Sequence, residues 1–133
     1  FENQPATEQQ LQEIHKNKTG MLIDAAARLG AIAALADEAT QRAISQYAFS
    51  IGLVFQIVDD VLDVTAVQET LGKPVGSDAE NGKTTFVTLY GVSRSMEMAE
   101  KITQQACEEL SRNFGMRAAF LQDLAKSLLQ RKK

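Results

Sequence analysis

The sequence contains very little cysteine and histidine. Among 133 residues it has one cysteine, Cys107, and one histidine, His15. A single cysteine cannot form a disulfide within the chain, and no other cysteine or histidine stands at zinc-ligand spacing. We therefore exclude a disulfide framework and a zinc site, and we assign His15 no function. The low cysteine content fits a reducing compartment, so we expect a cytoplasmic protein.

The sequence also lacks a basic excess and an uninterrupted apolar run. Its 14 lysines and arginines are outnumbered by 17 acidic residues, and only residues 131–133 form a basic cluster. Nucleic acid is therefore not an expected partner, because its phosphates are bound by clustered basic residues. The longest apolar stretch, residues 47–67, contains three aspartates, and each would cost about 2.5–3.5 kcal/mol at a bilayer centre. We expect no membrane span.

Proline is scarce, and its absence between Pro5 and Pro74 favours long helices. Thr7 and Gln10 have the spacing of a capping box at the start of the first helix. The second helix is rich in alanine and leucine, and we expect it to be buried. No alternating pattern longer than TFVTLY suggests a strand, so we predict an all-α fold. The predicted helices cover residues 7–16, 19–35, 37–67, 84–91, 93–114 and 116–130.

Three aspartates interrupt the most apolar part of the third predicted helix. Asp59 and Asp63 are four residues apart and lie on one helix face, with Gln56 one turn earlier and Asp60 beside them. Like charges at this spacing repel when both are ionised, so they need a cation. Carboxylate oxygens select a hard ion, and Mg²⁺ binds through one or two carboxylates and usually through substrate phosphates. The pattern indicates a Mg²⁺ and diphosphate site, and the alternative is a solvated acidic stripe.

Lysines that can meet a diphosphate lie beside glycines. Lys18 precedes a Thr-Gly pair, and Lys73 and Lys83 each follow a glycine within the turn-rich segment 68–83. Lysine binds phosphate as a point charge, and glycine lets the backbone approach it. We predict that the segment is a functional loop. Its Gly-Lys-Thr string is not a P-loop, because five residues instead of four separate the glycines and no strand precedes them.

Three segments resemble, in order, the C-terminal half of bacterial farnesyl diphosphate synthases, within the trans-polyprenyl diphosphate synthases. They are HKNKTGMLIDAAARLGA, FQIVDDVLDV and LGKPVGSDAENGKTT. The resemblance implies the C-terminal helices of an isoprenoid-synthase helical bundle. The metal ligands that it implies are those of the family's second aspartate-rich motif: Asp59, Asp60 and Asp63. The implied diphosphate-binding residues are Lys18, Lys73 and Lys83. The implied catalytic residues are Lys18, Thr19 and Gln56. Of these, Thr19 and Gln56 would place oxygen dipoles near the carbon that becomes cationic.

The resemblance also implies a reaction and its partners. Isopentenyl diphosphate would condense with geranyl or dimethylallyl diphosphate, with Mg²⁺ as cofactor, to give a short-chain isoprenyl diphosphate, and we expect farnesyl diphosphate. A homodimer is implied as well. Val87 stands where relatives commonly carry proline, which leaves the subfamily open.

The family's first aspartate-rich motif has no counterpart in this sequence. We therefore expect residues 1–133 to be the C-terminal part of one longer domain, to need its N-terminal half and to be inactive alone. The alternatives are a fragment of a class I terpene cyclase and a non-catalytic partner subunit of a prenyltransferase. The lysine pattern disfavours the first alternative, and the intact aspartate motif disfavours the second.

Overall fold

The computed structural model describes residues 5–71 and 84–132, and this part of the chain is helical with no strand. The prediction of an all-α fold is confirmed. None of the described helices is both long and apolar enough to cross a membrane. The helical elements are α1 (Glu8–His15), the π-helical turn η1 (Lys16–Gly20), α2 (Met21–Ala33), α3 (Glu38–Leu71), α5 (Phe86–Phe114), the 3₁₀ turn η2 (Gly115–Ala118) and α6 (Ala119–Leu129).

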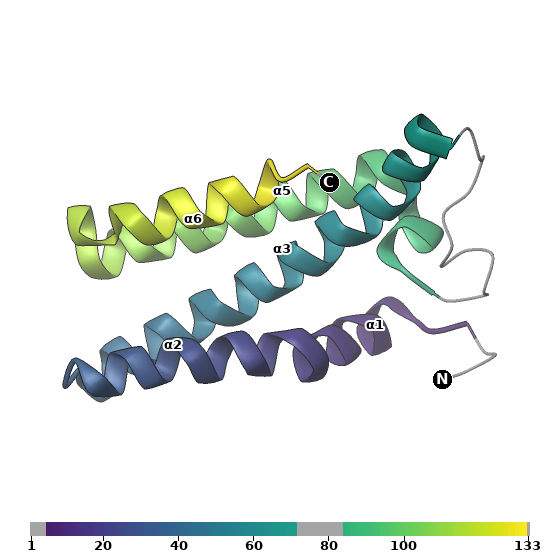
Figure 1. Cartoon of the computed structure of the whole chain (residues 1–133). Coiled ribbons are helices and arrows are strands. Elements are labelled where there is room, and N and C mark those ends of the chain that lie inside the picture. Colours follow the sequence, from purple (N-terminus) through teal and green to yellow (C-terminus); the bar gives the residue numbers. More distant parts are fainter. Residues whose placement is uncertain (1–4, 72–83, 133) are drawn as a thin grey trace.

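The long helix α3 lies between two helical arms (Figure 1). On one side, α5 and α6 form an antiparallel hairpin, and on the other side α1, η1 and α2 follow one another in a single line. Helix α3 continues to Leu71, four residues into the predicted loop 68–83. The rest of that loop, with Lys73 and Lys83, lies outside the described residues.

Two apolar clusters join α3 to the α5–α6 hairpin. One is centred on Val54, Ile57 and Val58 of α3 with Phe86 of α5, all at most 2% exposed. The members of the other come from α3, from the later part of α5, from η2 and from α6: Tyr47, Ile51, Ala106, Leu110, Ala118 and Ala125. The Tyr47 hydroxyl donates a 2.7 Å hydrogen bond to the Leu121 carbonyl, which ties α3 to α6. This side of the molecule holds most of its apolar core.

The first arm begins as the sequence predicts and then departs from it. Thr7 and Gln10 form both bonds of the capping box that starts α1. The expected break around the Lys-Thr-Gly string is absent, because η1 continues the helix from α1 into α2. The expectation that the second helix is buried is wrong for this chain. Leu22 is 73% exposed and Leu29 is 68% exposed, because the apolar face of α2 extends beyond what α3 covers.

Helix α5 confirms the two predicted helices over 84–91 and 93–114, joined at a kink. Thr85 caps its start through a second capping box with Thr88. Gly91 has φ +82°, a backbone conformation that glycine adopts without a side-chain clash, and regular helix geometry resumes after it. The kink lets the first turns of α5 place Phe86 in the core beside α3.

Candidate active site

Two glycines bring the start of α2 against the middle of α3. A Cβ atom on Gly52 would lie 3.1 Å from the Gly20 Cα, and one on Gly20 would lie 2.8 Å from the Phe49 ring. Because neither glycine carries a side chain, the two helix backbones approach closely at this crossing. The crossing therefore sets which neighbouring residues of the two helices can touch.

Thr19 and Gln56 flank this glycine crossing and are hydrogen-bonded. The Gln56 Nε2 donates to the Thr19 Oγ1 at 2.7 Å, across 37 positions of sequence. The bond fixes the orientation of the amide and leaves its carbonyl oxygen available as an acceptor. Two residues that the sequence singled out separately are thus brought together. Their catalytic roles stay predictions.

The three aspartates of α3 have different surroundings. The Asp59 side chain is 43% exposed, whereas Asp60 is buried at 8% exposure. Asp63 is half-buried one turn after Asp59. Neighbouring positions of an α-helix point about 100° apart, so Asp60 faces a different part of the molecule from the other two.

Asp60 lies beside the single histidine. Its Oδ2 atom is 3.9 Å from Nε2 of His15 in α1, and the His15 ring stacks on Phe86 of α5 with ring centroids 5.6 Å apart. Burial, and secondarily the charge of Lys18, lower the pKa of His15 below its ordinary value. The neutral ring is therefore favoured. Sequence reasoning gives His15 no function, because a lone histidine is more often a structural partner than a catalyst.

Asp59 lies beside a cation that sequence reasoning treats only as part of a basic tail. The Arg131 Nη2 is 3.4 Å from the Asp59 Oδ1 and 3.4 Å from the Phe55 carbonyl oxygen. The guanidinium carbon lies 4.2 Å from the centroid of the Phe55 ring. Nothing local in the sequence signals this contact, because 72 positions separate Arg131 from Asp59.

Of the predicted lysines, the structure describes Lys18. It is exposed in the π-helical turn η1, next to Thr19, and close enough to His15 to affect its pKa. A π-helical turn within a longer helix is frequent at functional sites. The neighbouring Lys16 instead places its Nζ 5.4 Å from the centre of the Phe49 ring. Lys18 is therefore the described lysine whose position agrees with a diphosphate-binding role.

The described residues include part of the predicted magnesium site. Among them, no group of three or more histidine, cysteine, aspartate or glutamate side chains is placed to hold a metal ion. Mg²⁺ in proteins often takes one or two carboxylates and completes its shell with water and phosphate. Asp59 and Asp63 offer oxygen-only donors on one face of α3, and Asp59 already has a cation as its neighbour. These two carboxylates fit Mg²⁺, and the assignment of all three aspartates stays a prediction.

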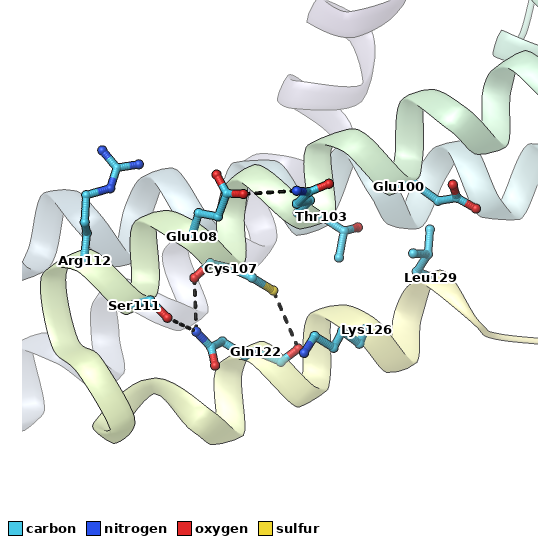
Figure 2. Close-up of a pocket in the computed structure, with 10 residues that line it drawn as sticks. Glu100, Thr103, Cys107, Glu108, Ser111, Arg112, Gln122, Lys126 and Leu129 are labelled. Carbon is cyan, nitrogen blue, oxygen red and sulfur yellow. Dashed lines mark hydrogen bonds between the residues drawn. The ribbon is translucent and has the colours of Figure 1, made fainter.

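A groove of about 730 Å³ lies elsewhere, along the seam between α5 and α6 (Figure 2). The Gln122 side chain lies across it. Its Nε2 donates hydrogen bonds to the Cys107 carbonyl at 3.1 Å and to the Ser111 Oγ at 2.8 Å. Burial raises the pKa of the Cys107 thiol, which disfavours the nucleophilic thiolate. The size of this groove does not make it the reaction site, since its lining includes none of the predicted site residues.

Comparison with known proteins identifies the family. Residues 1–121 match the family model of the polyprenyl synthetases. Geranylgeranyl pyrophosphate synthase 11, chloroplastic, of Arabidopsis thaliana is 46% identical over 102 residues, which are 77% of this chain and 29% of that protein. Geranylfarnesyl diphosphate synthase, chloroplastic, of Leucosceptrum canum is 45% identical over 77% of this chain and 28% of its own length. The chain thus spans less than a third of these relatives.

Two solved structures share the fold over nearly the whole chain. The geranyltransferase of Helicobacter pylori, complexed with magnesium and isoprenyl diphosphate, is 31% identical with a TM-score of 0.76, over 98% of this chain and 42% of that one. The heptaprenyl diphosphate synthase of Staphylococcus aureus is 25% identical with a TM-score of 0.83, over 98% of this chain and 52% of that one. The helices described above are therefore those of an isoprenyl diphosphate synthase fold.

Proposed function

The chain belongs to the polyprenyl synthetase family, and we propose that it is the part of a Mg²⁺-dependent trans-prenyltransferase that binds and ionises an allylic diphosphate. The observation that carries the proposal is the Gln56–Thr19 hydrogen bond, one turn before Asp59 on α3. It joins the end of η1, with Lys18, to the acidic face of α3. Cationic and anionic groups thus lie on either side of two neutral dipoles, as a diphosphate ester with its metal requires.

Each described residue has a distinct task in this proposal. Lys18 binds the diphosphate as a point charge. The carbonyl oxygen of Gln56, oriented by its bond to Thr19, faces the carbon that becomes cationic as the ester bond breaks. A dipole that is already oriented needs no reorganisation when the charge develops. Lys73 and Lys83, outside the described residues, are proposed to bind the same diphosphate.

Asp59 and Asp63 are the proposed main metal ligands, and Asp60 supports them from its buried position beside His15. When bound, Mg²⁺ supplies stabilisation of the charge on the departing pyrophosphate. The carboxylates would hold it on the acidic face of α3, away from the apolar residues that pack against α5. The proposed lysine side chains then need to neutralise only the remaining phosphate charge.

The complete reaction needs more than these residues. We propose that isopentenyl diphosphate is the nucleophile, that its site and a first aspartate-rich motif belong to a longer protein of which this chain is the C-terminal part, and that this protein is a homodimer. The sequence favours farnesyl diphosphate as the product, but the curated relatives above are named for longer products. Their names favour a product at least one isoprene unit longer. A cytoplasmic location stays a prediction, since both relatives are named chloroplastic.

The test is the replacement of Asp59 by alanine in the full-length protein. We expect turnover to fall by about a hundredfold or more, because a lost metal contact removes several kcal/mol of charge stabilisation. The thermal midpoint should change little, because the side chain is partly exposed. Asp123→Ala, an exposed aspartate of α6, is the matched control and should retain wild-type turnover. Near-normal turnover of Asp59→Ala would contradict the metal assignment.

A further inference from the structure

Arg131 folds back onto the candidate metal ligand from beyond the last helix. Helix α6 ends at Leu129, and the chain then turns so that the Arg131 guanidinium meets α3. It reaches both the Asp59 carboxylate and the Phe55 carbonyl with the same nitrogen, at 3.4 Å each. It also covers the face of the Phe55 ring at 4.2 Å. Phe55 and Asp59 are four residues apart, so one face of α3 provides all three contacts.

This contact differs from an ordinary exposed ion pair. The Arg131 side chain is only 27% exposed, although it carries a full charge two residues beyond the end of the last helix. Stacking on an aromatic ring and a hydrogen bond to a backbone carbonyl hold the planar guanidinium in one place. Lys132, the next residue in the same basic tail, is exposed. The tail is therefore docked on α3 through one specific side chain.

We propose that Arg131 is a further residue of the site, which sets the affinity of Asp59 for a divalent metal ion. The inference rests on the proposed function. The guanidinium is the counter-ion of Asp59 before metal binds, and Mg²⁺ must compete with it for the same carboxylate. The Phe55 ring offers the guanidinium a second contact on the same face of α3, which favours its return to Asp59 when the metal leaves.

The competition works in both directions. If Arg131 weakens metal binding at Asp59 by some factor, the metal weakens the Arg131 contact by the same factor. Metal binding therefore loosens the end of the chain from α3. The last turn of α6, which ends at Leu129 just before Arg131, is where this loosening should appear.

Metal binding to the full-length protein tests the proposal without reference to turnover. Mn²⁺ serves as the probe, since it shares the oxygen ligands of Mg²⁺ and its free ion is counted by electron paramagnetic resonance. The binding that Asp59→Asn removes defines the site. At that site we expect Arg131→Gln to bind Mn²⁺ about two- to fivefold more tightly, the range of a partly exposed ion pair. Arg131→Lys, which retains the charge without the planar fork, should fall between.

Lys132→Gln is the matched control, because it removes the same charge from the adjacent residue. It should leave the Mn²⁺ affinity at the wild-type value. In the wild type, Mn²⁺ should also speed hydrogen exchange in the last turn of α6, and in Arg131→Gln that exchange should already be fast without metal. Residues 131 and 132 lie beyond the last helix and Asp59 is partly exposed, so the variants should fold.

The possible failures are distinguishable. If Arg131→Gln binds Mn²⁺ no more tightly than Lys132→Gln while Asp59→Asn still removes the site, the role of Arg131 is refuted and the proposed function stands. If Asp59→Asn binds as much Mn²⁺ as the wild type, the metal assignment within the proposed function is refuted, and the inference with it. Tighter binding by Arg131→Gln alone supports both.

Discussion

The two arms that flank α3 are built on different principles. The α5–α6 hairpin meets α3 through large apolar side chains such as Phe86 and Leu110, which are 0% and 2% exposed. The α1–η1–α2 arm buries four residues, of which one is a large apolar side chain: Leu11, His15, Gly20 and Asp24. Yet this first arm carries Lys18 and Thr19. The large apolar contacts of α3 are thus mostly with one arm, whereas the other arm supplies the proposed diphosphate-binding lysine.

The difference shows what each kind of contact can do. Apolar packing is non-directional and contributes most of the folding free energy. Polar contacts contribute about 1 kcal/mol each but fix the orientation of individual groups. The first arm uses the bond from Gln56 to Thr19, the His15–Asp60 contact and the bond that the Ser45 hydroxyl donates to Asp24. We infer that the polar contacts of this arm mainly fix its orientation against α3 and contribute little to the folding free energy.

The largest expected effect compares one large side chain from each arm. Phe86→Ala removes a fully buried ring from the α3–α5 core, and we expect it to lower the free energy of unfolding by about 3–5 kcal/mol. Leu29→Ala on α2 removes a side chain that is 68% exposed, and we expect a change within about 0.5 kcal/mol. Urea denaturation followed by circular dichroism measures both. Similar losses for the two variants would refute the contrast between the arms.

A smaller effect tests the glycine crossing. Gly52→Leu places a side chain against the Gly20 backbone and should lower the free energy of unfolding by about 1–3 kcal/mol. It should also separate Thr19 from Gln56 and so reduce turnover. Gly30→Leu is the matched control, because nothing lies within 4 Å of its added Cβ. It should stabilise α2 by about 0.5–1 kcal/mol through helix propensity alone. A tolerated Gly52→Leu would show that close approach is not required.

The smallest effect concerns the bond between α3 and α6. Burial raises the pKa of Tyr47 to about 12. The unfolded chain, with its ordinary tyrosine pKa near 10, therefore ionises first, and the stabilisation that Tyr47 provides below pH 10 is lost as the pH rises towards 12. Tyr47→Phe should cost about 1 kcal/mol at neutral pH, because the Leu121 carbonyl loses its donor. Tyr47→Phe should also reduce the loss of unfolding free energy between pH 10 and 12. If the variant loses as much stability over this range as the wild type does, groups other than Tyr47 cause the loss.

The sequence allows prediction of the parts that depend on neighbouring residues. The capping box of Thr7 and the acidic face of α3 are both visible in the sequence, because the residues that form them stand three and four positions apart. The break predicted at the Lys-Thr-Gly string is wrong. Glycine is common at turns and so favours a break, whereas here Gly20 lies within a continuous helix and permits the close crossing with α3. The contact of Arg131 with Asp59 is not predictable, since no local pattern reports which side chains meet across 72 positions.

The π-helical turn η1 acts as a one-residue insertion in an otherwise regular helix. The buried positions of the first arm are spaced four, five and four residues apart, with the five spanning η1 from His15 to Gly20. Deleting one residue there would restore α-helical spacing and leave Asp24 on the helix face that meets Ser45. It would also remove the π-helical turn that places Thr19 beside Gln56. We therefore expect the length of this segment to constrain the protein as strongly as its composition does.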